Sequence, residues 1–134
     1  METDLIISEI NEQHKKANTA LENKDAGCYM SIFDDSLTYT TADQTKLNKL
    51  EYSTETEKNF RRVKRIETSH YRIKSSFENE IFIEKIARKS VIIKPKFLVL
   101  SKKQTIQTEE IFHWKNISGE WKVIAVEVVL EEKY

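Results

Sequence analysis

Residues 105–130 read TIQTEEIFHWKNISGEWKVIAVEVVL, and the strands in this stretch decide the fold class. β-Branched and aromatic residues dominate both of its halves, as is typical of strands. The four residues between the halves, 116–119 (NISG), are typical of a turn. We therefore predict that residues 105–115 and 120–130 form an antiparallel hairpin at the end of a sheet.

The strand-like period of two continues upstream of this hairpin. Apolar residues alternate with polar ones over residues 71–83, which predicts one long bent strand or two short ones. Residues 91–100 form the next predicted strand, in which Pro95 indicates a bulge or an edge. Lys102 and Lys103 are then expected to make a tight turn into the closing hairpin. The second half of the chain is thus predicted to be an antiparallel meander.

The first half of the chain has helical spacing. Residues 4–21 place apolar side chains at steps of three and four, and His14 completes that stripe. Asp25 is positioned to cap a second, short helix that runs to Phe33. The capping-box spacing of residues 54–57 (TETE) predicts a third helix, with apolar residues at steps of three up to Ile66. Between the second and third helices, a turn at residues 34–36 (DDS) leads into a short strand at residues 37–41.

The composition fits one globular domain that spans residues 1–134. Basic and acidic residues number 22 each, so the net charge of zero gives no electrostatic case for nucleic acid or anionic lipid. The sequence lacks a signal peptide and a long apolar run, so we expect a cytoplasmic protein that does not enter membranes. The single cysteine, Cys28, excludes an internal disulfide and a cysteine-rich metal cluster, and the histidines are too isolated for a metal site. No metal or cofactor is predicted.

Four local segments resemble a known superfamily. They are Lys24-Asp25 at the end of the first helix, Phe33-Asp34-Asp35 before a strand, residues 112–115 (FHWK) and residues 119–123 (GEWKV). These segments, and the order of elements over nearly the whole chain, resemble the nuclear transport factor 2-like superfamily, especially its small SnoaL-like and uncharacterised members. The resemblance implies an α+β, cystatin-like fold in which a curved antiparallel sheet forms a cone on N-terminal helices. It also implies a pocket inside the cone and a homodimer. The catalytic residue sets of the superfamily's isomerases and epoxide hydrolases are not recognisable in this sequence.

Side chains alternate along a strand, so a trial register assigns the hairpin residues to two faces. Pairing Lys115 with Glu120 places large aromatic residues and two carboxylates on one face, which we expect to cover the helices: Phe112, Trp114, Trp121, Glu110 and Glu127. The opposite face is too apolar to face water, since it would carry Leu98, Leu100, Ile111, His113, Ile124, Val126 and Val128, with a cross-strand pair of Lys96 and Glu109. An exposed apolar patch of this kind indicates an interface, so we predict a homodimer through the outer sheet face.

Glu127 is the first candidate for a catalytic residue. It lies between Val126 and Val128, and a buried carboxylate has a raised pKa unless it is paired, which suits a general base. In similar members of the superfamily, a polar residue six positions after the second tryptophan faces the pocket, and here that residue is Glu127. Glu110 is its expected diagonal neighbour. The alternative is that both carboxylates are solvated at the open end of the cone or bonded to a tyrosine.

The remaining candidates have structural alternatives as well. His14 should point inward and could pair with Glu127, or it could be a core histidine with satisfied hydrogen bonds. Tyr39, and more weakly Tyr29, could donate a hydrogen bond to a ligand oxygen, or could simply pack their rings in the core. Trp114 and Trp121 could line the pocket together with Phe112, or could fill the core.

Three functions remain open from the sequence. The first is binding of an apolar or amphipathic small molecule inside the cone. The second is an enzyme of the isomerase, cyclase or dehydratase type, with Glu127 as base and His14 or Tyr39 assisting. The third is a dimerisation or interaction module with a collapsed pocket. Whether the protein is an enzyme stays open, because fold analogy alone supports all three functions.

Overall fold

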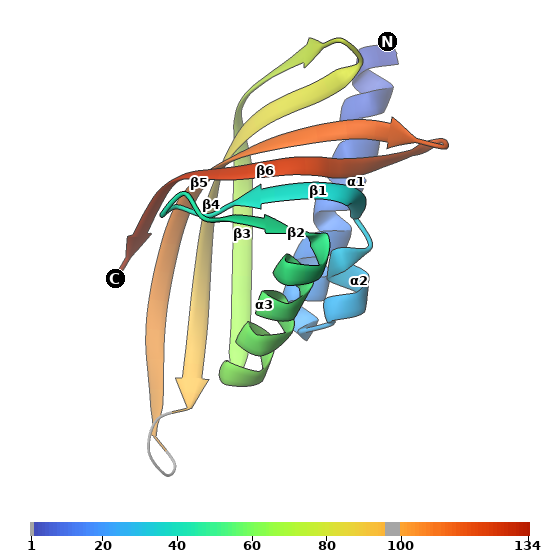
Figure 1. The fold of residues 1–134 in the computed structure, drawn as a ribbon. Coiled ribbons are helices and arrows are strands. Elements are labelled where there is room, and N and C mark those ends of the chain that lie inside the picture. Colours follow the sequence, from blue (N-terminus) through green and yellow to red (C-terminus); the bar gives the residue numbers. More distant parts are fainter. Residues whose placement is uncertain (1, 96–99) are drawn as a thin grey trace.

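The computed structural model describes residues 2–95 and 100–134. Within these residues, three helices lie against one six-stranded sheet (Figure 1). In chain order the elements are α1 (Glu2–Asn23), α2 (Ala26–Met30), β1 (Phe33–Thr40), β2 (Lys46–Asn48), α3 (Lys49–Arg62), β3 (Arg65–Glu78), β4 (Ile81–Pro95), β5 (Ser101–Ile117) and β6 (Glu120–Lys133).

The sheet has the strand order β2-β1-β6-β5-β4-β3. The strands from β3 to β6 pair in antiparallel fashion, which confirms the predicted meander and its closing hairpin. β1 pairs with β6 in parallel, a pairing that the sequence did not predict. β3, β4 and β5 each bend partway along, so the sheet curls beside the helices (Figure 1). This architecture confirms the predicted α+β fold with a curved sheet on N-terminal helices.

The first two helices follow their sequence signals. α1 extends two residues beyond the predicted helix at each end, and its buried face includes Ile10, His14 and Ala17, as the apolar spacing indicates. Asp25 caps α2, because its carboxylate accepts a hydrogen bond from the backbone N–H of Cys28. The short helix therefore begins where predicted, although it ends at Met30 rather than at Phe33.

The predicted start of the third helix is wrong. α3 begins at Lys49, because Asn48 and Glu51 form the capping box instead of residues 54–57. Thr54 lies inside the helix and donates its hydroxyl to the backbone carbonyl of Leu50. Two capping-box patterns lie six residues apart in this segment, and the upstream one starts the helix.

The predicted turns at residues 34–36 and 102–103 also differ from the structure. Residues 34–36 lie within β1, where the pairing with β6 changes register and the Asp34 carboxylate accepts the backbone N–H of Ser36. Of the two alternatives predicted for residues 71–83, one bent strand or two strands, the structure has two, β3 and β4, which extend beyond these residues. A turn at Asn79-Glu80 divides them, and both of these residues have positive φ. Lys102 and Lys103 do not form a turn, since they pair within β5 against residues 93 and 94 of β4.

Two bulges in β6 change which side chains face the helices. Ile124 and Val129 are left without a partner where the pairing of β5 with β6 shifts register. Each extra residue moves the side chains that follow it to the opposite face. Trp114 lies opposite Val123 and not opposite Trp121 for a different reason: the hairpin turn takes only residues 118 and 119 instead of the predicted 116–119, so Lys115 pairs with Lys122.

The bulge at Ile124 overturns part of the predicted face assignment. Val126 and Val128 are buried on the inner face, whereas they were expected on the outer face. Glu127 between them is exposed on the outer face, so the prediction that it points into the cone is wrong. The predicted outer residues within 96–99 lie outside the described residues.

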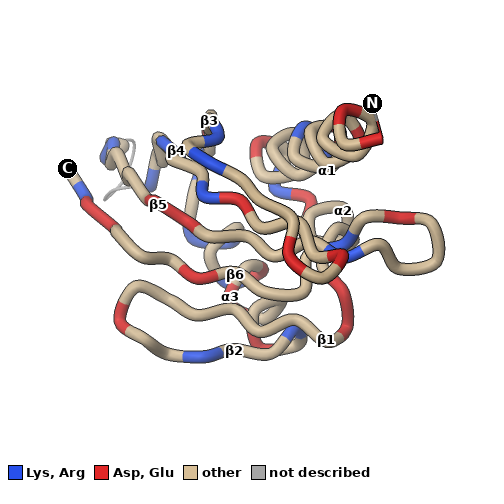
Figure 2. The backbone as a smooth tube through the Cα atoms, turned by 90° about the horizontal axis from the view of Figure 1, so that it is seen from above, with Lys and Arg blue, Asp and Glu red and all other residues tan. Residues whose placement is uncertain are grey.

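Charged residues are spread over the whole backbone rather than gathered on one surface (Figure 2). On the outer face, Nζ of Lys85 lies 3.1 Å from Oε1 of Glu109. The predicted partner of Glu109, Lys96, lies outside the described residues. No helix within residues 2–95 and 100–134 is long and apolar enough to cross a membrane.

Candidate functional site

Glu84 is fully buried and is the centre of a polar cluster between α1 and the sheet. Its Oε2 accepts hydrogen bonds from Nε2 of His14 at 2.5 Å and from the indole Nε1 of Trp114 at 2.6 Å. Its Oε1 accepts from Nε of Arg72 at 2.7 Å. Burial alone would raise the pKa of Glu84, but the hydrogen bonds and charges of His14 and Arg72 lower it overall. Both carboxylate oxygens are therefore occupied by donors from three elements, and this cluster holds the core together.

Asn18 connects a second arginine, Arg88, to His70. Nη1 of Arg88 donates to Oδ1 of Asn18 at 2.9 Å, and the amide nitrogen of Asn18 lies 3.0 Å from Nδ1 of His70. Because a guanidinium only donates, Oδ1 of Asn18 must face Arg88, and Nδ1 of His70 must accept. Burial, followed by the charge of His14, lowers the pKa of His70 to about 4. His70 is therefore neutral at neutral pH with its proton on Nε2, which makes that nitrogen a hydrogen-bond donor.

Arg88 also pairs with Glu110 on the neighbouring strand. Nε of Arg88 lies 3.3 Å from Oε2 of Glu110, and the hydroxyl of Thr108 donates to the same oxygen at 2.5 Å. Nη1 of Arg88 makes a further hydrogen bond to Thr68 at 3.1 Å. Burial alone would lower the pKa of Arg88, but Glu110 and the neighbouring tyrosines raise it overall, so the guanidinium stays charged. α1, β3 and β5 thus hold this side chain in one orientation.

Two atoms of the Arg88–Glu110 pair remain available. Nη2 of Arg88 and Oε1 of Glu110 have no hydrogen-bond partner among residues 2–95 and 100–134. The side chains of Arg88 and Glu110 are only 12% and 9% exposed. In the described part of the chain, however, every polar side-chain atom that is fully buried has a hydrogen-bond partner. Both atoms are therefore accessible to solvent, although the rest of the pair is buried.

Three tyrosines lie near this pair. The hydroxyl groups of Tyr29 and Tyr52 are 2.7 Å apart, and the ring of Tyr39 stacks on Tyr52 with a centroid separation of 3.9 Å. Burial above all raises the pKa of each phenol, and the negative charge of Glu110 raises all three further. The phenols are therefore protonated at neutral pH and can donate hydrogen bonds but cannot act as bases.

The tyrosines and the Arg88–Glu110 pair share one cavity on the inner side of the sheet. Its volume is about 950 Å³, within the range of small-molecule sites. Arg88, Glu110 and the tyrosines form its polar wall. Its apolar wall comes from the helices α1 and α3 and from the strands β3 to β6. The side chains of this wall are Leu21, Phe60, Val63, Ile66, Ile92, Ile106 and Val128.

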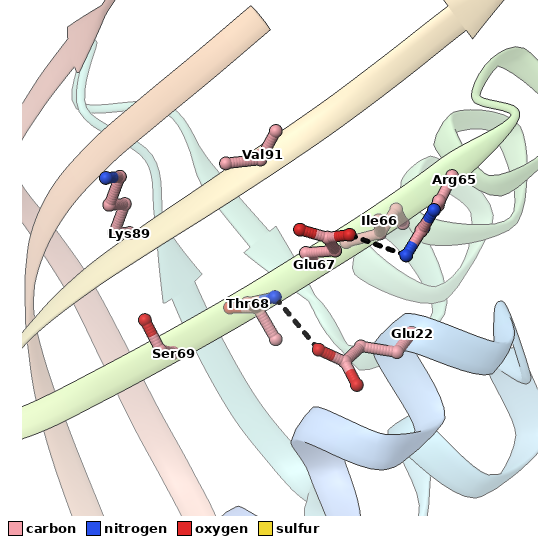
Figure 3. A pocket seen from close by; sticks show the side chains of 8 residues that line it. All are labelled: Glu22, Arg65, Ile66, Glu67, Thr68, Ser69, Lys89 and Val91. Carbon is pink, nitrogen blue, oxygen red and sulfur yellow. Dashed lines mark hydrogen bonds and ion pairs between the residues drawn. The ribbon is translucent and has the colours of Figure 1, made fainter. Parts of the chain in front are cut away.

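A second hollow of about 620 Å³ lies where α1 meets the edge strand β3 (Figure 3). Its two carboxylates and its arginine are already engaged within the protein. Glu22 accepts the backbone N–H of Thr68 at 3.2 Å, and Arg65 pairs with Glu67 at 2.7 Å. This hollow therefore offers a ligand less than the inner cavity does.

The inner cavity includes some of the residues expected from the sequence. Glu110, Tyr29 and Tyr39 line it. Phe112, Trp114 and Trp121 are buried in the main core and do not line it, and His14 is held by Glu84 rather than by Glu127. The exposed Glu127 does not line it either.

Sequence reasoning missed Arg88, Glu84, Asn18 and Arg72. The signal was present in β4, where residues 82–90 alternate Phe, Glu, Ile, Arg and Ser on one face. Charged side chains that share a face with large apolar ones indicate a buried polar network. Among residues 2–95 and 100–134, no group of three or more His, Cys, Asp or Glu side chains could hold a metal ion.

No known protein-family model matches the sequence, and no curated protein sequence matches it. Solved structures match it in shape. A conserved protein from Planctomyces limnophilus has a TM-score of 0.84 at 15% identity, with 100% of both chains covered. A nuclear transport factor 2-like superfamily protein from Salmonella enterica serovar Typhimurium has a TM-score of 0.78 at 9% identity, with 94% of this chain and 91% of the other covered.

A hexachlorocyclohexane dehydrochlorinase also matches, with a TM-score of 0.78 at 11% identity and coverage of 100% of this chain and 93% of the other. Identities this low establish the fold alone. The chain therefore has the nuclear transport factor 2-like fold, which confirms the resemblance seen in the sequence.

Proposed function

We propose that this protein binds an apolar or amphipathic small molecule in the cavity inside its cone. The observation that supports this function is the cavity itself, which is about 950 Å³ and has a polar wall facing an apolar one. Apolar walls with a few fixed polar groups are the usual composition of small-molecule sites. The Arg88–Glu110 pair and the protonated tyrosines would orient the polar end of the ligand.

Binding can be tested with N-phenyl-1-naphthylamine, a neutral apolar dye that fluoresces when it leaves water. Isoleucine methyl groups report where the dye binds, because Ile66, Ile92 and Ile106 line the cavity. Ile83 and Ile111 face outward, since they alternate with buried Phe82 and Phe112. We expect saturable fluorescence and methyl NMR shifts at the cavity positions only. Unsaturable fluorescence, or shifts at the outer positions alone, would contradict the proposal.

A matched pair of variants on β5 separates filling of the cavity from general disturbance of the strand. Ile106→Trp should fill part of the cavity and weaken dye binding by about tenfold or more, the scale of 1.4 kcal/mol. Ile111→Trp makes the same change on the outer face and should leave dye affinity within about twofold. Equal effects of the two variants would place the dye elsewhere.

A second candidate function is proton transfer within the same cavity. It is favoured by Glu110, whose free Oε1 is an acceptor close to phenols that can donate to a developing oxyanion. Glu110 replaces Glu127 as the candidate base, because Glu127 is exposed on the outer face. Tyr39 remains a candidate donor.

The probe for this candidate is 2-tetralone, a neutral ketone with exchangeable protons beside its carbonyl group. In D₂O a base takes a proton from carbon, a phenol stabilises the enolate oxygen, and a deuteron returns to carbon. We expect wild-type protein to accelerate this exchange and Glu110→Gln to abolish the acceleration. Exchange at the uncatalysed rate, under conditions where the cavity methyl groups show bound ketone, would refute catalysis.

The outer sheet face is the proposed interface of a homodimer. Ile83, Ile111 and His113 are partly exposed next to one another on this face, beside the Lys85–Glu109 ion pair. A two-fold axis would place this mixed patch against itself. Sedimentation should show a dimer that Ile111→Lys converts to monomer, because the new charge would be buried at the interface. A wild-type monomer at high concentration would refute the dimer.

A further inference from the structure

Within the described part of the chain, the Arg88–Glu110 pair presents one free donor and one free acceptor to the cavity. The donor is Nη2 of Arg88 and the acceptor is Oε1 of Glu110, and both residues line the cavity. These two side chains are ion-paired with each other. A ligand that approaches one of the two free atoms therefore approaches the other as well.

Both atoms are held in place before any ligand binds. Thr108 and Arg88 both bond Oε2 of Glu110, which leaves Oε1 as the oxygen that is available. Asn18 and Thr68 both accept from Nη1 of Arg88, which leaves Nη2 available. Because the protein has already ordered these side chains, a matching ligand loses little free energy in organising them.

The cavity shows no preference for a charged ligand. The charged residues that line it are four acids and four bases: Asp43, Glu55, Glu110, Glu131, Arg62, Arg88, Lys94 and Lys133. A ligand carboxylate or sulfonate would accept from Arg88 but would place an acceptor and a negative charge against Oε1 of Glu110. A ligand ammonium group would donate to Glu110 but would face the charge of Arg88. Like charges at close range are unfavourable in a site of low polarity.

A hydroxyl group satisfies both atoms at once, because its hydrogen donates to Oε1 and its oxygen accepts from Nη2. We infer that the cavity selects a neutral ligand that presents a hydroxyl group on an aromatic or alicyclic body, and that Glu110 is the residue that excludes anions. This inference rests on the proposed binding function and specifies the class of ligand. The neutral phenols beside the pair add donors and no charge, which is consistent with a neutral ligand.

A naphthalene series tests the selection at neutral pH, with the cavity isoleucine methyl groups as the NMR readout. The probes are naphthalene, 2-naphthol, 2-naphthoate and 2-naphthylmethylammonium, which share one ring system and differ in their polar group. We expect 2-naphthol to bind about tenfold or more tightly than each of the others, as charge-assisted hydrogen bonds allow. Binding of 2-naphthoate as tight as that of 2-naphthol would overturn the inference while leaving the binding function intact. No cavity shift with any probe would overturn both.

Glu110→Gln supplies a readout that loss of stability alone would not produce. The amide keeps the size of the side chain and removes its negative charge. Affinity for 2-naphthoate should rise and affinity for 2-naphthol should fall, so that their ratio changes by about tenfold or more. Glu127→Gln is the matched control, because Glu127 is exposed on the outer face and does not line the cavity, and it should leave the ratio unchanged. An unchanged ratio in Glu110→Gln would refute the role of Glu110, and dye binding by the variant shows that the cavity is intact.

Discussion

Replacing Glu84 by glutamine should lower the free energy of unfolding by about 3–5 kcal/mol, the usual cost of removing one partner from a buried ion pair. The substitution leaves no cavity, so the change reports on hydrogen bonds and charge. The carboxylate accepts from His14, Trp114 and Arg72, and its side chain is 0% exposed. A glutamine amide keeps one acceptor oxygen, but its NH₂ group replaces the other oxygen and would face a group that also donates. The expected loss is a large part of the stability of a typical domain.

Urea unfolding followed by tryptophan fluorescence measures this loss, and an unchanged m-value would show that the transition remains comparable. Glu127→Gln is the matched control, since the same chemical change on the exposed face should alter stability by less than about 0.5 kcal/mol. Because the folded-state pKa of Glu84 is lowered, its contribution is present above its ordinary value of 4.5 and is lost as the pH falls further through the folded-state value. The difference between the wild type and Glu84→Gln should therefore shrink in acid. A loss below about 1 kcal/mol for Glu84→Gln, or an equal loss for Glu127→Gln, would refute the assignment of buried and exposed carboxylates.

Other predictions concern stability elsewhere in the fold. Folding lowers the pKa of His70 from 6.5 to about 4, so on acidification the unfolded chain takes up the proton before the folded protein does. The free energy of unfolding should therefore drop as the pH falls from 6.5 to about 4, and His70 should not affect it above pH 6.5. The drop should be about 1–2 kcal/mol, because solvent around the half-buried ring weakens the effect. The urea midpoint of His70→Gln should not show this decrease over the same pH range. Asn48→Ala should cost about 1 kcal/mol in thermal or urea unfolding, and Thr54→Ala clearly less, because Asn48 is the residue that caps α3. Trp114→Phe should cost about 1.5–3 kcal/mol by removing a donor to Glu84, and in a double-mutant cycle with Glu84→Gln the losses should be less than additive.

The sequence predicts the fold well where a local pattern decides the structure. The apolar spacing of α1 and the cap at Asp25 each depend on neighbours close in the chain, and each appears as expected. The closing hairpin also forms where predicted, although its turn takes residues 118 and 119 rather than 116–119. The parallel pairing of β1 with β6 joins segments that are far apart in the sequence, and no local pattern encodes it. Two capping boxes near residues 48–57 satisfy the same local rule, and packing of the helix selects the first.

The candidate site is harder to predict because it depends on the register of β6. A bulge residue such as Ile124 is as apolar as its neighbours, so nothing in the pattern marks it. The bulge at Ile124 reverses the orientation of the side chains that follow it as far as the next bulge at Val129, and Glu127 turns outward as a result. Glu110 precedes the turn on β5 and was assigned to the correct face, since Phe112 and Trp114 beside it alternate regularly.

The two buried carboxylates on neighbouring strands show how hydrogen-bond saturation separates a structural group from a functional one. Glu84 and Glu110 are each paired with an arginine of β3 or β4 and each share a face with large apolar side chains. Three donors saturate both oxygens of Glu84, so a ligand has nothing left to bind there. Both donors to Glu110 converge on Oε2, and Oε1 is left accessible. The free oxygen can therefore accept a hydrogen bond from water or from a ligand, so loss of Glu110 should alter ligand choice where loss of Glu84 alters stability.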